Sequence, residues 1–88
     1  MKVLKFGAVW CGGCLIMKPR WEEIEKELDW LKTEYIDVDE KPEYVKKYNI
    51  TDYPCFIFLD KSGQEFKRLY GEIDKQELIS ILENNKNK

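Results

Sequence analysis

The stretch VLKFGAVWCGGC at residues 3–14 decides the fold, because a mostly apolar run stops where two glycines lie between two cysteines. Such a run is typical of a strand buried on both faces of a sheet. Gly12 and Gly13 allow a tight passage from that strand, residues 3–10, into a helix. Cys11 and Cys14 are therefore a C-x-x-C pair at the start of a helix that follows a buried strand, a context far more specific than the four letters alone.

Apolar residues then recur at spacings of three and four, which predicts a helix with one buried face. They are Cys14, Met17, Trp21, Ile24, Leu28 and Leu31. Pro19 lies inside this pattern, and we expect it to kink the helix rather than end it, because the periodicity continues beyond it. Residues 34–39 alternate as a second strand does. Pro42 is well placed to open a short helix at residues 43–48, with Tyr44, Val45 and Tyr48 facing inward.

The second half of the chain predicts a hairpin and a final helix. Residues 55–59, CFIFL, are the strongest strand signal, and residues 60–63 form a turn before an alternating partner strand at 65–70. Asp74 and Glu77 have the spacing of a capping box for a helix whose buried residues are Leu78, Ile81 and Leu82. The order β-α-β-α-β-β-α predicts an α/β fold with a central four-stranded mixed sheet flanked by three helices. We expect one domain over residues 1–88, with a frayed polar tail at 84–88.

Composition excludes several classes of protein. The chain has 88 residues, 43% apolar and 14% aromatic, with a net charge of -2, which fits one small folded domain. With no histidine, it has no Ser-His-Asp or Cys-His catalytic site and no histidine-ligated metal. The cations form no basic stripe, and no uncharged apolar run approaches the ~18 residues of a membrane span. We therefore expect no nucleic-acid or membrane partner. The N-terminus lacks the features of a secretory signal, so we expect a cytoplasmic protein. We also expect it to be a monomer.

The position of the two cysteines predicts thiol–disulfide exchange. Cys11 precedes the first helical turn, where unpaired backbone N–H groups and the positive helix end stabilise a thiolate, and we expect it to meet solvent. Cys14 falls on the inward helix face with Met17 and Trp21 and is expected to be partly or wholly shielded. Cys11 would attack a substrate disulfide, and Cys14 would resolve the mixed disulfide, so that the redox-active Cys11–Cys14 disulfide replaces any cofactor.

Two alternatives to this chemistry are a thiolate metal site and a non-catalytic adaptor. A closed zinc site takes four ligands, and this chain adds only one cysteine and no histidine to the C-x-x-C pair, so we expect no metal. An adaptor does not need both cysteines. Redox chemistry therefore accounts for the pair best, and reduction of insulin disulfides by dithiothreitol or the metal content of the purified protein would separate the three readings.

The residues around the two cysteines, and several residues beyond them, resemble the thioredoxin family. Residues 6–14, FGAVWCGGC, are similar to its signature F-x-A-x-W-C-G-P-C, and Pro19 matches the proline that kinks the family's active-site helix. Tyr53-Pro54 precedes the strongest strand, where the family has a cis-proline that faces the active site, and Ser62-Gly63 and Gly71 match its hairpin turn and late glycine. The resemblance covers nearly the whole chain but lacks the family's N-terminal strand and helix. It therefore describes a minimal, glutaredoxin-sized member with a C-G-G-C motif.

The resemblance implies a thioredoxin-like fold and a protein that reduces disulfides in client proteins. It also implies that a thioredoxin-reductase-like enzyme recharges the protein. Trp10 would shield Cys11, while Tyr53 and Pro54, beside Gly12 and Gly13 of the motif, would bind the extended backbone of the substrate. For Trp10 and Tyr53 the alternative is ordinary packing.

Three residues depart from the family pattern. Gly13 replaces the motif proline that accompanies a reducing protein, which leaves the redox potential open. Lys5 occupies the position where thioredoxins bury an aspartate. It either favours a nearby thiolate electrostatically or extends to solvent without a chemical role. Cys55 follows Pro54 and is either a small buried core thiol or a group that tunes or traps Cys11 after oxidation.

Overall fold

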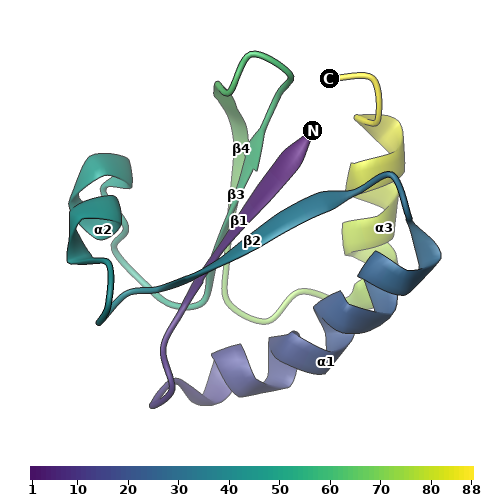
Figure 1. Ribbon diagram of the computed structural model, residues 1–88. Helices are drawn as coiled ribbons and strands as arrows, with labels where there is room; N and C mark the ends of the chain where they lie inside the picture. Colours follow the sequence, from purple (N-terminus) through teal and green to yellow (C-terminus); the bar gives the residue numbers. More distant parts are fainter.

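The computed structural model describes all 88 residues as a four-stranded mixed sheet with helices on both faces (Figure 1). Its elements are β1 (Lys2–Gly7), α1 (Gly12–Glu27), β2 (Lys32–Asp37), α2 (Pro42–Tyr48), β3 (Cys55–Leu59), β4 (Glu65–Tyr70) and α3 (Lys75–Asn84). The strands lie in the order β2-β1-β3-β4, with β2 parallel to β1 and the other two pairs antiparallel. The predicted α/β order and mixed sheet are confirmed. No helix is long and apolar enough to cross a membrane.

The helices divide the core into two clusters. Figure 1 shows α1 and α3 on one face of the sheet and α2 on the other. Leu4 and Phe6 of β1 pack with Ile57 toward α2, whose Tyr44, Val45 and Tyr48 are half-buried against this cluster, as predicted. Val3 and Phe56 face the opposite way, toward Trp21 of α1 and Leu82 of α3. This alternation along each strand is what a sheet covered on both faces requires.

The ends of the first two strands differ from the prediction. β1 ends at Gly7 rather than at Trp10, and β2 spans Lys32–Asp37 rather than residues 34–39. Asp37 is the cause at β2, because its carboxylate accepts the backbone N–H of Asp39 at 2.9 Å and so turns the chain out of the strand. Gly7 pairs with Asp37, so the parallel ladder ends at both residues together.

Helix α1 continues through Pro19, as predicted, but it ends earlier than its apolar pattern indicates. The last helical residue is Glu27, and the N–H of Leu28 donates to the carbonyl of Ile24 at 2.8 Å as the helix closes. Leu28 is still buried, and Leu31 packs against the same cluster from the following turn. The spacing of apolar residues therefore predicted burial correctly beyond the point where the helix itself stops.

Helix α3 begins as predicted, whereas the chain end differs. The carboxylate of Asp74 accepts the N–H of Gln76 at 3.2 Å, which caps the first turn. The expected frayed tail is not free at its end. The backbone N–H of Lys61, in the β3–β4 turn, donates to the carbonyl of Lys88, and the Lys88 ammonium lies 5.3 Å from the ring centroid of Phe66. These contacts hold the tail against the hairpin.

Candidate active site

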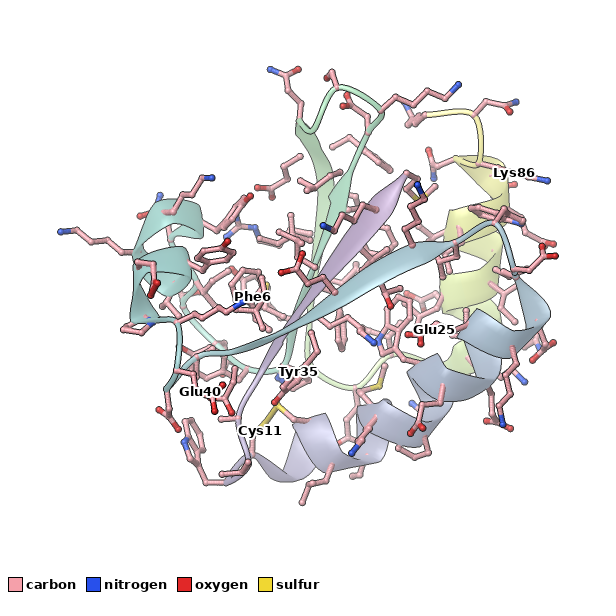
Figure 2. The ribbon with its side chains drawn as sticks, viewed as in Figure 1. Phe6, Cys11, Glu25, Tyr35, Glu40 and Lys86 are labelled. Atoms are coloured by element: carbon pink, nitrogen blue, oxygen red, sulfur yellow. A yellow bond between two sulfur atoms is a disulfide. The ribbon has the colours of Figure 1, made fainter.

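Cys11 and Cys14 form a disulfide at the end of the molecule where β1 leads into α1 (Figure 2). Their Cα atoms are 5.2 Å apart, a separation that the two-residue spacer and the first helical turn fix. Cys11 has an extended backbone and is the N-cap residue of α1, and its sulfur accepts the backbone N–H of Cys14 at 3.2 Å. The attacking position that we predicted is therefore surrounded by the free N–H groups of the helix start, which stabilise negative charge.

The exposure of Cys11 differs from the prediction, whereas the partial shielding of Cys14 agrees with it. Cys11 is buried, with 8% of its surface exposed, and Cys14 is half-buried. Cys11 turns back over the helix end and packs in the α2-side cluster beside Ala8 and Tyr53. Cys14 lies over Gly7, where a Cβ atom would be 3.1 Å from the Cys14 sulfur. Because Gly7 has no side chain, the Cys14 sulfur can lie close to the backbone of β1 at this position.

Trp10 stands beside the disulfide and is held there by two contacts. Its indole Nε1 donates to Asp39 at 2.8 Å, and its ring lies edge-on to Tyr53 with centroids 5.8 Å apart. Trp10 is nevertheless 62% exposed, so it is not a core residue. An ordered but exposed aromatic ring is well suited to contact a partner. Ordinary packing, the alternative for Trp10, does not describe this position.

Pro54 approaches the motif from the loop before β3. The Tyr53–Pro54 peptide bond is cis, Pro54 is buried, and a Cβ at Gly13 would lie 3.1 Å from Pro54 Cδ. Gly13 thus allows Pro54 to lie close to the first turn of α1. Gly12 is exposed, and a Cβ there would meet nothing within 4 Å. The structure therefore brings together Trp10, Gly12, Gly13, Tyr53 and Pro54 around the disulfide.

Large apolar side chains are exposed on either side of the two cysteines in the sequence. We call Val9, Trp10, Leu15 and Ile16 the apolar collar. Val9 is 76% exposed, Leu15 60% and Ile16 46%, whereas most other large apolar residues are buried. Exposed apolar groups gathered at one place mark contact surfaces in soluble proteins. The collar gives the disulfide an apolar setting at the surface.

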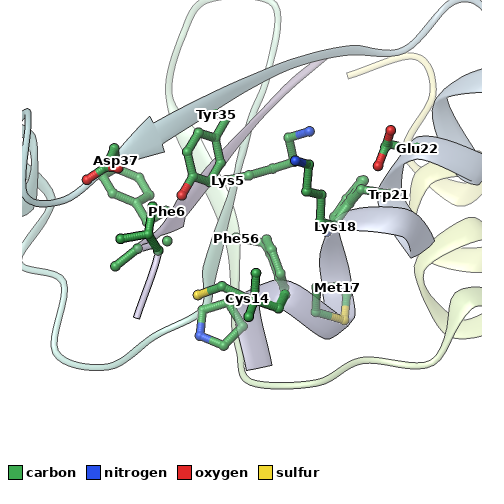
Figure 3. A pocket seen from close by; sticks show the side chains of 15 residues that line it. Lys5, Phe6, Cys14, Met17, Lys18, Trp21, Glu22, Tyr35, Asp37 and Phe56 are labelled. Carbon is green, nitrogen blue, oxygen red and sulfur yellow. The ribbon is translucent and has the colours of Figure 1, made fainter. Parts of the chain in front are cut away.

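A cavity of about 440 Å³ lies between α1 and the sheet, with the side chain of Cys14 in its wall (Figure 3). Residues of β1 and β2 line it on the sheet side, and residues of α1 on the other; its polar lining residues are Lys5, Lys18, Glu22, Tyr35 and Asp37. Lys18, Glu22 and Tyr35 are exposed, so the cavity is open to solvent along the β2 edge. Water can therefore reach Cys14 through this cavity, from the side of β2.

Lys5 neither extends freely to solvent nor contacts the disulfide. Its ammonium donates to Glu25 Oε2 at 2.7 Å, and the same oxygen accepts the Thr33 hydroxyl at 3.0 Å. The ammonium also lies 6.0 Å from the ring centroid of Trp21. Lys5 is consequently fixed under α1 with its positive charge at the wall of the cavity.

Cys55 is fully buried on the α2 side of the sheet and makes no disulfide. Burial raises the pKa of its thiol from an ordinary 9.0 to about 11. A thiol that stays protonated at neutral pH is a poor nucleophile. This position agrees with the core-thiol reading of Cys55.

The raised pKa of Cys55 predicts that stability falls in alkaline solution. The unfolded thiol loses its proton near pH 9 and the folded thiol near 11, so unfolding releases a proton in this window and folding is disfavoured as the pH rises. For two pKa units we expect a loss of about 2 kcal/mol between pH 8 and 11. Urea unfolding should measure the free energy of unfolding of the reduced parent and of Cys55→Ala at each pH. From pH 8 to pH 11, the stability of the parent relative to Cys55→Ala should decrease by this amount. A constant difference would contradict the prediction.

Two contacts at the site were missed from the sequence. Asp39 anchors Trp10 across 29 residues, and Tyr35 lines the cavity beside Cys14. The alternating pattern of residues 34–39 did place Tyr35 and Asp39 in or next to one strand. The alternation of strands and helices implied a parallel pair of strands, but no sequence signal showed that the register of β1 and β2 would bring both residues to the cysteines. His, Cys, Asp and Glu side chains form no group of three that could hold a metal ion.

A disulfide between the N-cap and the first turn of a helix, packed on a mixed sheet and surrounded by exposed apolar groups, defines a thiol–disulfide oxidoreductase. The thioredoxin family model matches residues 1–84. A thioredoxin of Chlamydia trachomatis serovar D is 32% identical over 80 residues, which cover 91% of this chain and 78% of that protein. The chain belongs to the thioredoxin family.

Solved structures agree with this assignment. The thioredoxin NaTrxh of Nicotiana alata superimposes with a TM-score of 0.87 at 30% identity, covering 96% of this chain and 71% of that one. Thioredoxin 1 of Thermosipho africanus gives a TM-score of 0.83 at 33% identity, covering 96% and 92%. The thioredoxin-like fold that the C-G-G-C resemblance implied is confirmed.

Proposed function

We propose that this protein reduces disulfides of client proteins, with Cys11 as the attacking and Cys14 as the resolving cysteine. The position of Cys11 as the N-cap of α1 carries the assignment, because a thiolate there faces the free N–H groups of the first helical turn. The attack forms a mixed disulfide between Cys11 and the client and releases one client thiolate. Cys14 then attacks Cys11, which restores the Cys11–Cys14 disulfide and releases the second client thiolate.

The surroundings of the disulfide support a protein client. The apolar collar and Tyr53 offer a contact surface larger than a small thiol needs. Pro54 and Gly13 lie close together beside the cysteines, and we propose that the extended backbone of a client binds next to them. A thioredoxin-reductase-like enzyme would return the disulfide to the dithiol. We propose that the protein works in the cytoplasm, because a C-x-x-C pair beside a β-α-β pattern is typical of a catalytic redox motif in that reducing compartment. We propose further that it works as a monomer.

The order of the two cysteines is tested by trapping the intermediate. Cys14→Ser should accumulate a mixed disulfide between Cys11 and a disulfide-containing client such as insulin, because no second thiol resolves it. Non-reducing mass spectrometry of the covalent adduct identifies the cysteine. Cys11→Ser is the matched control and should give little adduct. An adduct on Cys14 in that control, as abundant as the Cys11 adduct, would contradict the assignment.

The direction of the reaction is tested by the reduction potential of the pair in glutathione buffers. A protein that reduces clients should have a potential near about -270 mV, the value of thioredoxin. A potential near about -120 mV, that of a strong oxidant, would reverse the proposed direction. The Cys55→Ala variant should give the same potential as the parent, because its thiol is protonated and fully buried.

A further inference from the structure

The wall of the cavity behind Cys14 is built from paired residues of β1 and β2. In the parallel ladder, Lys5 pairs with Tyr35 and Gly7 with Asp37. Alternate residues of a strand point to the same face, so these four lie on the face that α1 covers. Cys14 faces them from the first turn of the helix. The sulfur that resolves the mixed disulfide is thus surrounded by side chains that the reaction described above does not use.

Tyr35 is a polar side chain that borders the same part of the cavity as this sulfur. A Cβ at Gly7 would lie 3.1 Å from Cys14 Sγ and 3.2 Å from Tyr35 Cε1, so both groups border the same small gap. Figure 2 shows the Tyr35 ring extending from β2 toward the disulfide, and Figure 3 shows Tyr35 and Cys14 in the lining of the same cavity. The Tyr35 hydroxyl makes no hydrogen bond within the protein, and Tyr35 is 53% exposed. A side chain on Gly7 would separate the two.

The charged groups of the cavity leave Tyr35 as the group that favours a thiolate. Asp37 already accepts backbone N–H groups of the β2–α2 turn, and Glu25 is bound by Lys5 and Thr33. Lys18 and Glu22 are exposed at the mouth of the cavity and have opposite charges. The ion pair of Lys5 with Glu25 brings no net charge to the cavity, so the donor that the protein presents near the Cys14 sulfur is the Tyr35 hydroxyl.

We propose that Tyr35 stabilises the thiolate of Cys14 by donating its hydroxyl hydrogen. The inference rests on the proposed function, in which Cys14 resolves the mixed disulfide. The Cys14 thiol first loses its proton to water in the open cavity. Its thiolate then forms the bond to Cys11 while the bond from Cys11 to the client sulfur breaks, and the client thiolate leaves with the electron pair. Tyr35 keeps its own proton throughout.

The electrostatics of Tyr35 suit a donor. Partial burial and the negative charges of Asp37, Glu40 and Asp39 raise the pKa of its hydroxyl. Tyr35 thus remains protonated across the physiological range and does not act as a base. Hydrogen bonds to a charged partner are stronger than those between neutral groups. The thiolate of Cys14, rather than its thiol, is the form that gains from Tyr35.

Tyr35→Phe tests this role, because it removes the hydroxyl and retains the ring. We expect about tenfold less Cys14 thiolate at neutral pH, offset about threefold because a more basic thiolate is a better nucleophile, so that resolution slows about threefold. At a pH where Cys14 is fully ionised in both proteins, the variant should instead be about threefold faster. The two pH profiles should therefore cross. Profiles that coincide, or that differ by the same factor at every pH, would overturn the proposal.

Reduced protein mixed with dithiobis(nitrobenzoate) reports both steps in one trace. Attack by Cys11 releases the first nitrothiobenzoate, and resolution by Cys14 releases the second. Only the second release should change in Tyr35→Phe. Tyr44→Phe, on the opposite face of the sheet, is the matched control and should follow the parent profile. A parent that shows no first release contradicts the proposed function itself rather than the role of Tyr35.

Discussion

Cys11→Ser should reduce the rate of insulin-disulfide reduction by dithiothreitol to that of dithiothreitol alone. A serine hydroxyl is not ionised at neutral pH and does not attack a disulfide sulfur, whereas the thiolate at the N-cap of α1 does. The helix should be retained, because serine is itself a favourable N-cap residue. Turbidity of the precipitating insulin chain measures the rate, and circular dichroism confirms the fold.

Cys55→Ala is the matched control for Cys11→Ser, because it also removes one thiol. Its thiol is fully buried and protonated, so the variant should reduce insulin at the parent rate. Equal losses in the two variants would show that activity follows a general effect of thiol removal. Retained activity in Cys11→Ser would show that another group attacks the client. Either result contradicts the assignment of Cys11.

Trp21→Ala should cause the largest loss of stability. Trp21 is the largest fully buried side chain, it packs 5.3 Å from Phe56 between ring centroids, and it lies between α1 and the sheet. Replacing a buried tryptophan with alanine costs about 3–5 kcal/mol. A chain of this length is stable by about 4–13 kcal/mol in total, so the variant loses a large share of that free energy. The midpoint of thermal unfolding should fall by about 15–30 °C.

Trp21→Phe separates packing from polarity at the same site. The indole Nε1 of Trp21 is buried and has no hydrogen-bond partner, which costs about 1–3 kcal/mol in a folded protein. Phenylalanine retains an aromatic ring against Phe56 and removes this donor. We expect Trp21→Phe to lose less than half of what Trp21→Ala loses, as measured by urea unfolding. Equal losses in Trp21→Phe and Trp21→Ala would show that a phenyl ring does not replace the packing of the indole ring at this site.

Local sequence signals predicted most of the fold. The bounds of β3 and β4, and Pro42 as the first residue of α2, agree with the structure because apolar alternation, turn residues and a proline each act within a few positions. The ends of β1 and β2 depend on Asp37, whose carboxylate binds the next turn, and on the pairing of Asp37 with Gly7. Pairing between strands cannot be read from either strand alone.

The site was predicted where it is local and missed where it depends on distant contacts. Cys11 and Cys14 were found because a strand, two glycines and a helix follow one another directly. Asp39 and Tyr35 reach the same place only because β2 lies parallel to β1. The exposure of Cys11 was predicted incorrectly because this residue precedes the helix, where periodicity gives no information on packing, and its side chain packs with residues that are distant in the sequence, such as Tyr53.

The two ends of the chain lie near each other in the structure (Figure 1). They lie at the end of the sheet opposite to the β1–α1 connection, which carries the disulfide. The contact between Lys61 and Lys88 holds Lys88 beside the β3–β4 turn. β1 starts at the same end of the sheet, where Lys2 pairs with Leu59. A tether attached to either end, whether a neighbouring domain, an affinity handle or a solid support, would therefore leave from the side opposite the reactive sulfurs. Immobilised molecules would present the apolar collar outward to a passing client.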